Sequence, residues 1–310
     1  EITGIGFADR IYGRYSAEAV EKYGLEADEL ISREVADQIA ADDSIDSLKI
    51  QSVLTTECND GVPRKAYGID MSTRQPVAFH EPVGVIAAQS VGEPGTQLTL
   101  DTKHSSGVAG SGAISRGLPR VEELLEARSP KGQAYISTIA GVVSTWEEGR
   151  YNVVQVTPDA GKAEHFKLEG RKAKVKDGAS VKTGAVIASK AKGAEPIIAP
   201  FDGVAELTQD EIVLVANAGA PLKVSVPSDF ALTVKEGDRV EPGDRLSEGS
   251  LNLQDLMKYK GIEETERYIL NDILTIYAAQ GHEISAKHLE VIIRQMFSRV
   301  MIEEPGDTAF

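Results

Sequence analysis

The sequence "VKEGDRVEPGDRLS" (residues 234–247) repeats the pattern of an earlier stretch, "VKDGASVKTGAVIA" (residues 175–188). Each copy predicts a short strand, a turn at an acidic residue followed by glycine, a second turn that ends in glycine, and another strand. Between the copies, "EPIIAPFDGVAELTQDEIVLV" (residues 195–215) adds two strands on either side of an Asp202–Gly203 turn. Short strands at this spacing are typical of a small barrel or sandwich, which we place at residues 131–249.

Helical patterns on both sides of this region predict an α+β chain with four parts. Residues 1–79 are expected to hold short helices and a strand, and residues 80–130 a helical hairpin around a glycine-rich loop. Residues 131–249 form the β region, and residues 250–310 return to amphipathic helices.

Local signals set the expected ends of these elements. Ser16 is a candidate N-cap for a helix that Gly24 ends, and the alternating stretch "SLKIQSVLTT" (residues 47–56) predicts a strand. In the second part, Pro94 is expected to separate two helices, and the second helix ends at His104.

The composition narrows the class of protein. With 33 Lys and Arg against 48 Asp and Glu, the formal net charge is −15. This charge argues against a protein that binds nucleic acid by itself, because phosphate affinity comes mostly from basic side chains. No apolar run approaches the roughly 20 residues of a membrane span, and no signal peptide is evident. The single cysteine, Cys58, excludes a disulfide framework, so we expect a cytoplasmic protein without membrane contact.

The helix before the glycine-rich loop carries the candidate site. Gln97, Leu100, Asp101 and His104 are spaced so that they share one helix face. An amide, an aliphatic side chain, a carboxylate and an imidazole on one face suit a polar, partly aromatic ligand. The alternative is a solvent-facing helix with an ordinary surface histidine. Four glycines between positions 107 and 117 favour the first interpretation, because such segments order and fray easily.

Three separated blocks of sequence resemble a known family. They are "PVGVIAAQSVGEPGTQLTL" (residues 82–100), "GLPRVEELLEARSPK" (residues 117–131) and "YAAQGHEISAKHLEVIIRQM" (residues 277–296). In this order they closely resemble the β′ subunit of bacterial multisubunit RNA polymerase, and the similarity extends along nearly the whole chain. The resemblance implies a trigger loop with its flanking helices at 80–130. It also implies a jaw and barrel–sandwich region at 131–249, followed by clamp-side helices.

The resemblance further implies a role in DNA-directed RNA polymerase, a nucleotidyltransferase whose trigger loop folds on the incoming nucleoside triphosphate. In the family, the positions of Gln97, Leu100 and His104 face that nucleotide, Leu100 against the base and His104 beside the triphosphate. We expect His104 to act by placement and electrostatics more than by proton donation. The implied partners are the remaining β′ segment, the β, α and ω subunits, a sigma factor, template DNA and RNA.

Two residues beside this histidine depart from the family pattern. Where the family has Met-Arg-Thr-Phe-His, this chain has Leu100-Asp101-Thr102-Lys103-His104. Asp101 places a negative charge that repels a nearby triphosphate. Lys103 restores part of the attraction, but its ammonium lacks the forked geometry of a guanidinium.

The catalytic metal site is expected to lie outside this chain. The Asp-Phe-Asp-Gly-Asp signature that holds Mg²⁺ in the family does not occur here, so the chain alone is expected to be inactive. The family also binds zinc through four cysteines. Here Cys58 stands alone, and Pro63 and Ala66 occupy the positions of an expected Cys-x-x-Cys pair. One thiolate does not make a tetrahedral site, so we expect no zinc.

Two alternatives come from the same residues. The repeat is similar to a half-motif of biotinyl or lipoyl carrier domains, but its tip "APFDGVAE" (residues 199–206) lacks the lysine that would carry the prosthetic group. A non-catalytic binding scaffold is the second alternative. His282 and His288 are expected to have packing or surface roles and not to react. Arg294 and Gln295 are expected to contact a helix, a subunit or nucleic acid.

Overall fold

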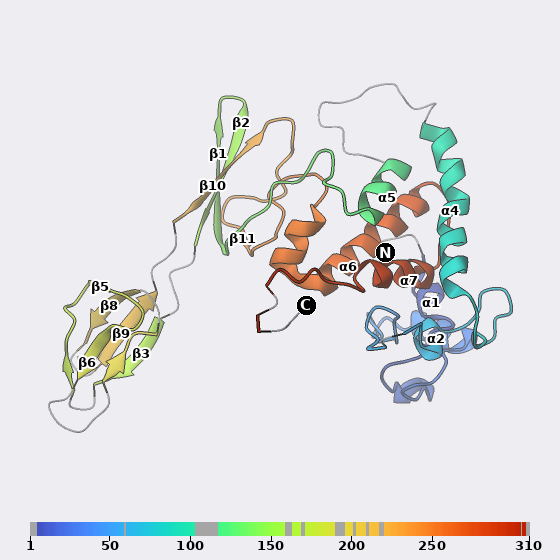
Figure 1. Cartoon of the computed structure of the whole chain (residues 1–310), viewed down its shortest axis with the longest axis horizontal. Coiled ribbons are helices and arrows are strands. Elements are labelled where there is room, and N and C mark those ends of the chain that lie inside the picture. The colour runs from blue at the N-terminus through green and yellow to red at the C-terminus, as the bar shows by residue number, and fades with distance from the viewer. Residues whose placement is uncertain are drawn as a thin grey trace. The chain divides into compact units, whose positions relative to one another are not determined.

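The chain divides into two units. The computed structural model describes residues 5–58, 60–102, 117–158, 163–168, 171–189, 196–200, 203–208, 211–216, 220–304 and 306–307. The first unit combines Glu1–Gln133 with Ser250–Phe310, and the second is Ala134–Gly249. Figure 1 shows helices in the first unit and strands in the second, which confirms the predicted α+β class. The finer division at residues 79, 130 and 249 into four parts stays a prediction.

The first unit is built from helices that come from both ends of the chain. The described elements are α1 (Phe7–Ile11), η1 (Glu21–Tyr23, a 3-10 helix), α2 (Arg33–Ala40), α3 (Arg64–Tyr67), α4 (Val83–Thr102), α5 (Leu118–Leu125), α6 (Leu253–Ala279) and α7 (Ala286–Met296). Gly261 interrupts α6 with a non-helical backbone, so α6 consists of two helical segments joined by a kink. None of the helices in the described part of the chain has both the length and the apolar character that a bilayer span needs.

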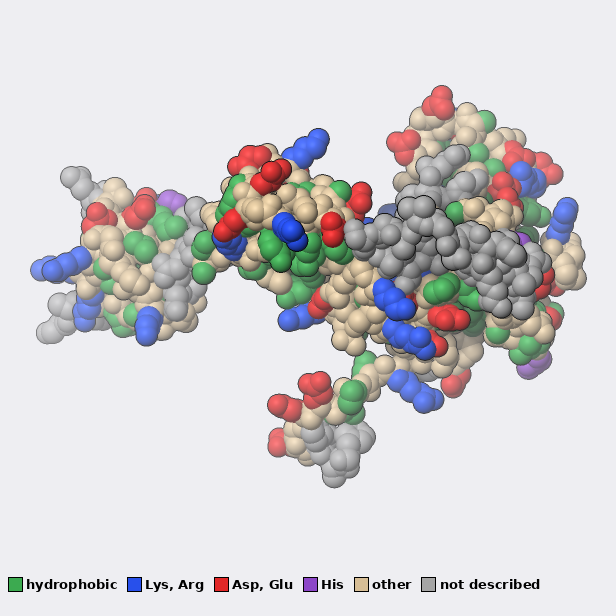
Figure 2. Space-filling model, turned by 90° about the horizontal axis from the view of Figure 1, so that it is seen from above, with side chains coloured by type: hydrophobic (Ala, Val, Ile, Leu, Met, Phe, Trp, Pro, Cys, Tyr) green, Lys and Arg blue, Asp and Glu red, His purple; other side chains and the backbone are tan. Residues whose placement is uncertain are grey.

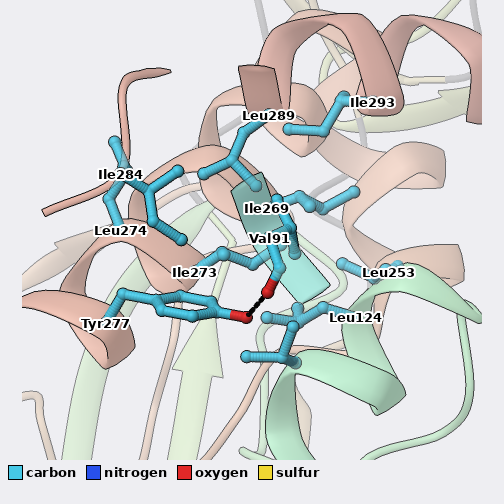
Figure 3. Packing of buried hydrophobic residues seen from close by; sticks show 11 residues of the cluster. Val91, Leu124, Leu253, Ile269, Ile273, Leu274, Tyr277, Ile284, Leu289 and Ile293 are labelled. Atoms are coloured by element: carbon cyan, nitrogen blue, oxygen red, sulfur yellow. Dashed lines mark hydrogen bonds between the residues drawn. The ribbon is translucent and has the colours of Figure 1, made fainter. Parts of the chain in front are cut away.

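The main core of this unit lies between α4, α5, α6 and α7 (Figure 3). Its buried apolar residues recur every three or four positions, as in the series Ile269, Ile273 and Tyr277 on α6. This spacing gives each helix one apolar stripe, and the stripes face one another. Each buried side chain of this size contributes about 1.5 to 3 kcal/mol.

The N-terminal segment departs from the predicted helix. Ser16 does not cap a helix but forms an isolated β-bridge with Ile50. The residues after it fold back on themselves, because Val20 pairs with Leu25 around the short η1 turn. Gly24 does end this turn, with a left-handed φ of 64°. Long-range pairing therefore overrides the local helical pattern.

The strand expected at residues 47–56 is also wrong. Only Ile50 takes part in a bridge, and the chain turns directly afterwards, where the Ser52 carbonyl accepts hydrogen bonds from the hydroxyls of Thr55 and Thr56. The alternation at Leu48 and Ile50 instead packs these side chains against the N-terminal core cluster. The alternating apolar residues are therefore buried by packing, without the continuous backbone pairing of a β-strand.

The second unit contains three antiparallel sheets among its described residues. One has the order β10 (Leu222–Pro227), β2 (Tyr151–Thr157), β1 (Gly141–Glu148) and β11 (Arg239–Val240). The next has the order β3 (Ala163–Lys167), β9 (Glu211–Ala216), β8 (Gly203–Leu207) and β5 (Ala179–Val181). The third has the order β4 (Lys172–Ala173), β6 (Val186–Ser189) and β7 (Ile197–Ile198). This arrangement agrees with the β-rich region expected from the sequence.

The two copies of the sequence repeat make matching hydrogen bonds. In the first copy, the N–H groups of Lys174, Gly178 and Gly184 donate to the carbonyls of Ile187, Ala205 and Ala199. At the corresponding positions of the second copy, Thr233, Gly237 and Gly243 donate to the carbonyls of Leu246, Val143 and Ser137. The turn glycines Gly178 and Gly237 have φ of 72° and 86°, a left-handed conformation that glycine adopts without strain. The two copies therefore share a backbone structure as well as a sequence pattern.

The first copy of the repeat, residues 175–188, lies in the long connection between strands β2 and β10. Strands β2 and β10 are hydrogen-bonded neighbours, yet residues 158–221 separate them in the sequence. These residues contribute the second and third sheets, with a core of their own that includes Val181, Ile187 and Leu214. Val143, Val154 and Val226 belong to a separate core in the first sheet.

Candidate functional site

Helix α4 runs from Val83 to Thr102 although Pro94 lies inside it. The expected separation into two helices at this proline is therefore wrong. A proline in a helix interior costs about 3 kcal/mol through a lost hydrogen bond and a steric clash. Tertiary packing offsets this cost, because Ala87, Val91, Pro94 and Gly95 are all buried.

A tyrosine on another helix donates a hydrogen bond to α4 next to the interruption. Pro94 has no N–H to donate to the Ser90 carbonyl four residues earlier. One residue further, the Val91 carbonyl accepts a hydrogen bond of 2.8 Å from the hydroxyl of Tyr277 on α6 (Figure 3). The Ser90 hydroxyl donates to the Ile86 carbonyl at 2.7 Å, a local bond that often accompanies helix bending. Tertiary contacts thus support α4 where its own ladder is weakest.

The predicted site residues fall at the far end of this helix. Gln97, Leu100 and Asp101 lie in the last turns of α4, and the helical backbone places these three positions on one face. Lys103 and His104 lie outside the described residues. The nucleotide-facing roles of all five residues stay predictions.

Helix α5, which follows the glycine-rich sequence, is anchored to α6 as well. Arg120 is 3% exposed and donates to Asp272 at 3.1 Å and to the Tyr268 hydroxyl at 3.0 Å. It also forms an ion pair with Glu123 within α5. Both helices that border residues 103–116 are therefore fixed on the same partner, α4 through Tyr277 and α5 through Arg120.

A second polar cluster joins the N-terminal segment to α7, and sequence analysis missed it. Arg14 and Glu290 are 5% and 4% exposed and form a bidentate ion pair, with Nη1 and Oε2 3.0 Å apart. The same carboxylate accepts hydrogen bonds from the Ser52 hydroxyl at 2.9 Å and from the Val53 N–H at 3.2 Å. One available signal was the position of Glu290, directly beside Leu289 and three residues before Ile293 on the apolar face of α7.

Two further ionisable groups on α7 are buried beside this pair. Lys287 donates to the Ile69 carbonyl and lies 5.0 Å from the ring centre of Tyr67. Burial, assisted by the charge of Arg14, lowers the pKa of Lys287 to about 8. Burial, assisted by the charges of Lys287 and Arg14, lowers the pKa of His288 to about 4. His288 is therefore a neutral, packed histidine at pH 7, which agrees with the packing role expected for it.

The lowered pKa of His288 predicts a loss of stability in acid. The unfolded chain takes up this proton near pH 6.5 and the folded chain only near pH 4. The contribution is therefore complete above pH 6.5 and is lost as pH falls toward 4. Relative to a His288→Gln variant, the free energy of unfolding should fall by about 2 to 3 kcal/mol between pH 7 and pH 4.5. Urea unfolding of both proteins at the two pH values measures this difference, and equal losses would contradict the assignment.

The surroundings of Cys58 do not fit a zinc site. The Cys58 thiol donates to the Asp60 carbonyl at 2.9 Å, and Arg294 on α7 donates to the carbonyls of Cys58 and Gly61. Ala66, at one of the expected cysteine positions, is buried in an apolar cluster. Among the residues that the structure describes, no group of three or more His, Cys, Asp or Glu could hold a metal ion. A guanidinium from α7 holds this loop, and its positive charge disfavours a cation beside it.

Comparison with known proteins decides the family. The family model for RNA polymerase Rpb1, domain 5, matches residues 19–310. The chain belongs to this family. The three sequence blocks that carry the resemblance fall on α4, on α5, and on the end of α6 with α7, four elements that share one core.

Relatives of this Rpb1 domain 5 chain include bacterial polymerase subunits. It is 40% identical over 300 residues to the DNA-directed RNA polymerase subunit beta′ of Chloroflexus aggregans, covering 96% of this chain and 20% of that protein. Identity to the subunit beta′ of Roseiflexus castenholzii is 37% over 319 residues, with 98% and 21% covered. For Desulforudis audaxviator it is 38% over 307 residues, with 97% and 21% covered. The chain thus spans about a fifth of the length of these curated relatives, and the resemblance to bacterial β′ is confirmed.

Proposed function

We propose that this chain supplies the trigger loop of a DNA-directed RNA polymerase as part of its β′ subunit. The observation that carries the proposal is the family match over residues 19–310, in which a continuous helix, Val83–Thr102, leads into the sequence that contains His104. The relatives with 37% to 40% identity are themselves named as the beta′ subunit of this enzyme.

In this proposal the end of α4 faces the incoming nucleoside triphosphate. Leu100 offers an apolar surface to the base, Gln97 an amide to polar groups, and His104 a donor beside the phosphates. Phosphoryl and nucleotidyl transfer need aligned oxygens and stabilised charge more than they need covalent help from protein. Placement and electrostatics at His104 therefore account for its role.

The charges beside His104 set how strongly this helix attracts the nucleotide. Asp101 repels the triphosphate at close range, and Lys103 offsets part of this repulsion. The ammonium of Lys103 is a mobile point charge without the fork of an arginine, so it positions phosphate oxygens less firmly. We therefore propose a weaker electrostatic contribution to nucleotide binding than an arginine at position 101 would provide.

The remaining parts of the reaction belong to partners. Mg²⁺ is held by ligands outside this sequence, and the proposed partners are the remaining β′ segment, the β, α and ω subunits, a sigma factor, DNA and RNA in the cytoplasm. The charge of the chain supports this dependence. On the face shown in Figure 2, acidic and basic side chains of the described residues are interspersed, and the formal net charge is −15. Such a surface is a poor nucleic-acid binder by itself.

Reconstitution tests the proposal as a whole. The purified chain alone should make no RNA from a DNA template with nucleoside triphosphates and Mg²⁺. Assembled with the remaining β′ segment, β, α and ω, it should support RNA synthesis, and omitting it should reduce synthesis to background. Size-exclusion chromatography shows whether a complex forms in each case. RNA synthesis at the same rate without the chain would contradict the proposal.

A further inference from the structure

We propose that Tyr277 is a positioning residue for nucleotide addition: its hydroxyl holds α4 at the Pro94 interruption and so sets the direction of the segment that carries Gln97, Leu100 and Asp101. This inference rests on the proposed trigger-loop function. It assigns to α6, which carries none of the predicted site residues, a defined part in the reaction.

Helix α4 is weakest at Pro94. A proline removes one hydrogen bond of the helical ladder and pushes away the carbonyl four residues earlier, here that of Ser90. Sharp changes of helix direction occur at such places. The hydrogen bond from Tyr277 reaches the Val91 carbonyl, the next one along the chain, at 2.8 Å. The contact thus lies where the direction of α4 is least determined by its own backbone.

Tyr277 is held firmly by the core around it. Tyr277 is 1% exposed and belongs to the core cluster that also contains Ile273 and Leu124 (Figure 3). Burial raises the pKa of its hydroxyl above the ordinary value, so the group stays a neutral donor at pH 7. A donor fixed in a packed core holds its acceptor in place more firmly than water does.

At Gly95, helix α4 lies next to both Tyr277 and the start of α5. A Cβ atom added to Gly95 would lie 4.0 Å from the Tyr277 hydroxyl and 3.5 Å from Cδ1 of Leu118, the first residue of α5. Both distances are those of ordinary van der Waals contacts. Tyr277 and the start of α5 therefore both border α4 at Gly95.

Helix α4 continues well beyond Pro94. From Pro94 to Thr102, α4 extends by about 12 Å at 1.5 Å per residue. A tilt of about 10° at Pro94 therefore moves the far end by roughly 2 Å. Displacements of about 1 Å at reacting groups are enough to slow enzymes up to 100-fold. The hydroxyl of Tyr277 is thus in a position to affect chemistry that takes place at a distance from it.

The test is single-nucleotide addition by assembled polymerase that contains Tyr277→Phe in this chain. At saturating nucleoside triphosphate, the rate constant should fall by about 3- to 10-fold, the range expected for one lost hydrogen bond. Tyr23→Phe is the matched control. It removes a hydroxyl that donates to Asp42 at 2.6 Å in a different core cluster, and it should leave the rate unchanged. A Tyr277→Phe enzyme as fast as the parent would overturn the proposal.

A second pair of enzymes separates positioning from a general structural role. If Tyr277 acts through the residues that α4 carries, Tyr277→Phe should change the rate by less than about 2-fold in a Gln97→Ala, Leu100→Ala background. The same 3- to 10-fold loss in both backgrounds would show a structural role only and would overturn the proposal. If His104→Ala alone leaves the rate unchanged, the trigger-loop function fails, and the positioning role fails with it. If His104→Ala is slow and Tyr277→Phe is not, only the positioning role fails.

Discussion

A His104→Ala change is expected to slow single-nucleotide addition by an assembled polymerase about 100- to 1,000-fold, the usual cost of removing one fixed donor from a charge-stabilising site. The proposed imidazole lies beside the triphosphate, where it aligns the phosphate and stabilises charge on the departing pyrophosphate. Alanine removes both effects. Rapid-quench measurement of the addition rate over a range of nucleotide concentrations separates a loss of rate from a loss of affinity.

A His104→Gln variant distinguishes the two possible roles of this imidazole. Glutamine keeps a neutral hydrogen-bond donor but does not transfer a proton at neutral pH. If placement and electrostatics dominate, the glutamine enzyme should keep much more activity than the alanine enzyme. An equal loss in both variants, with unchanged nucleotide affinity, would favour proton donation. An unchanged rate in His104→Ala, with assembly and template binding intact, would leave the scaffold interpretation.

A Glu290→Gln change is expected to lower the free energy of unfolding of the chain by about 3 to 5 kcal/mol, because it leaves the buried charge of Arg14 without its partner. The amide has only one acceptor atom for the two Arg14 donors, the Ser52 hydroxyl and the Val53 N–H that now share the carboxylate. Urea unfolding at pH 7 measures the loss.

Two variants control this experiment. Asp37→Asn makes the same kind of change in the Arg33–Asp37 pair, whose side chains are about half exposed, and should have a much smaller effect because water screens the pair. Replacing both Arg14 and Glu290 by leucine removes the buried charges together and should recover much of the loss. A Glu290→Gln loss as small as that of Asp37→Asn would contradict the structural role of the buried pair.

The sequence repeat shows how much local chemistry can determine. An acidic residue followed by glycine specifies a turn that needs a positive φ, and Gly178 and Gly237 adopt 72° and 86°. Both copies of the repeat fold in the same way because the residues that specify each turn are neighbours in the sequence. The single face of Gln97, Leu100 and Asp101 follows from helical periodicity in the same manner.

The contact that anchors α4, between Tyr277 and Val91, has no comparable pattern in the sequence. Tyr277 and Val91 are 186 positions apart in the sequence, so nothing in the helical period of either segment indicates that they meet. For the same reason Pro94 predicted a helix end that the fold does not make. Ser16 predicted a cap and forms a bridge with Ile50 instead.

By itself, the sequence determined the α+β class, the β-rich repeat, the family and the helix that carries the candidate site, because each depends on neighbouring residues or on the order of motifs. Tertiary structure alone decided that α4 continues through Pro94 and that Arg14 and Glu290, 276 positions apart, form one buried pair. Contacts of this kind depend on which surfaces meet after folding. Burial then makes them strong, because water no longer competes for the same hydrogen bonds.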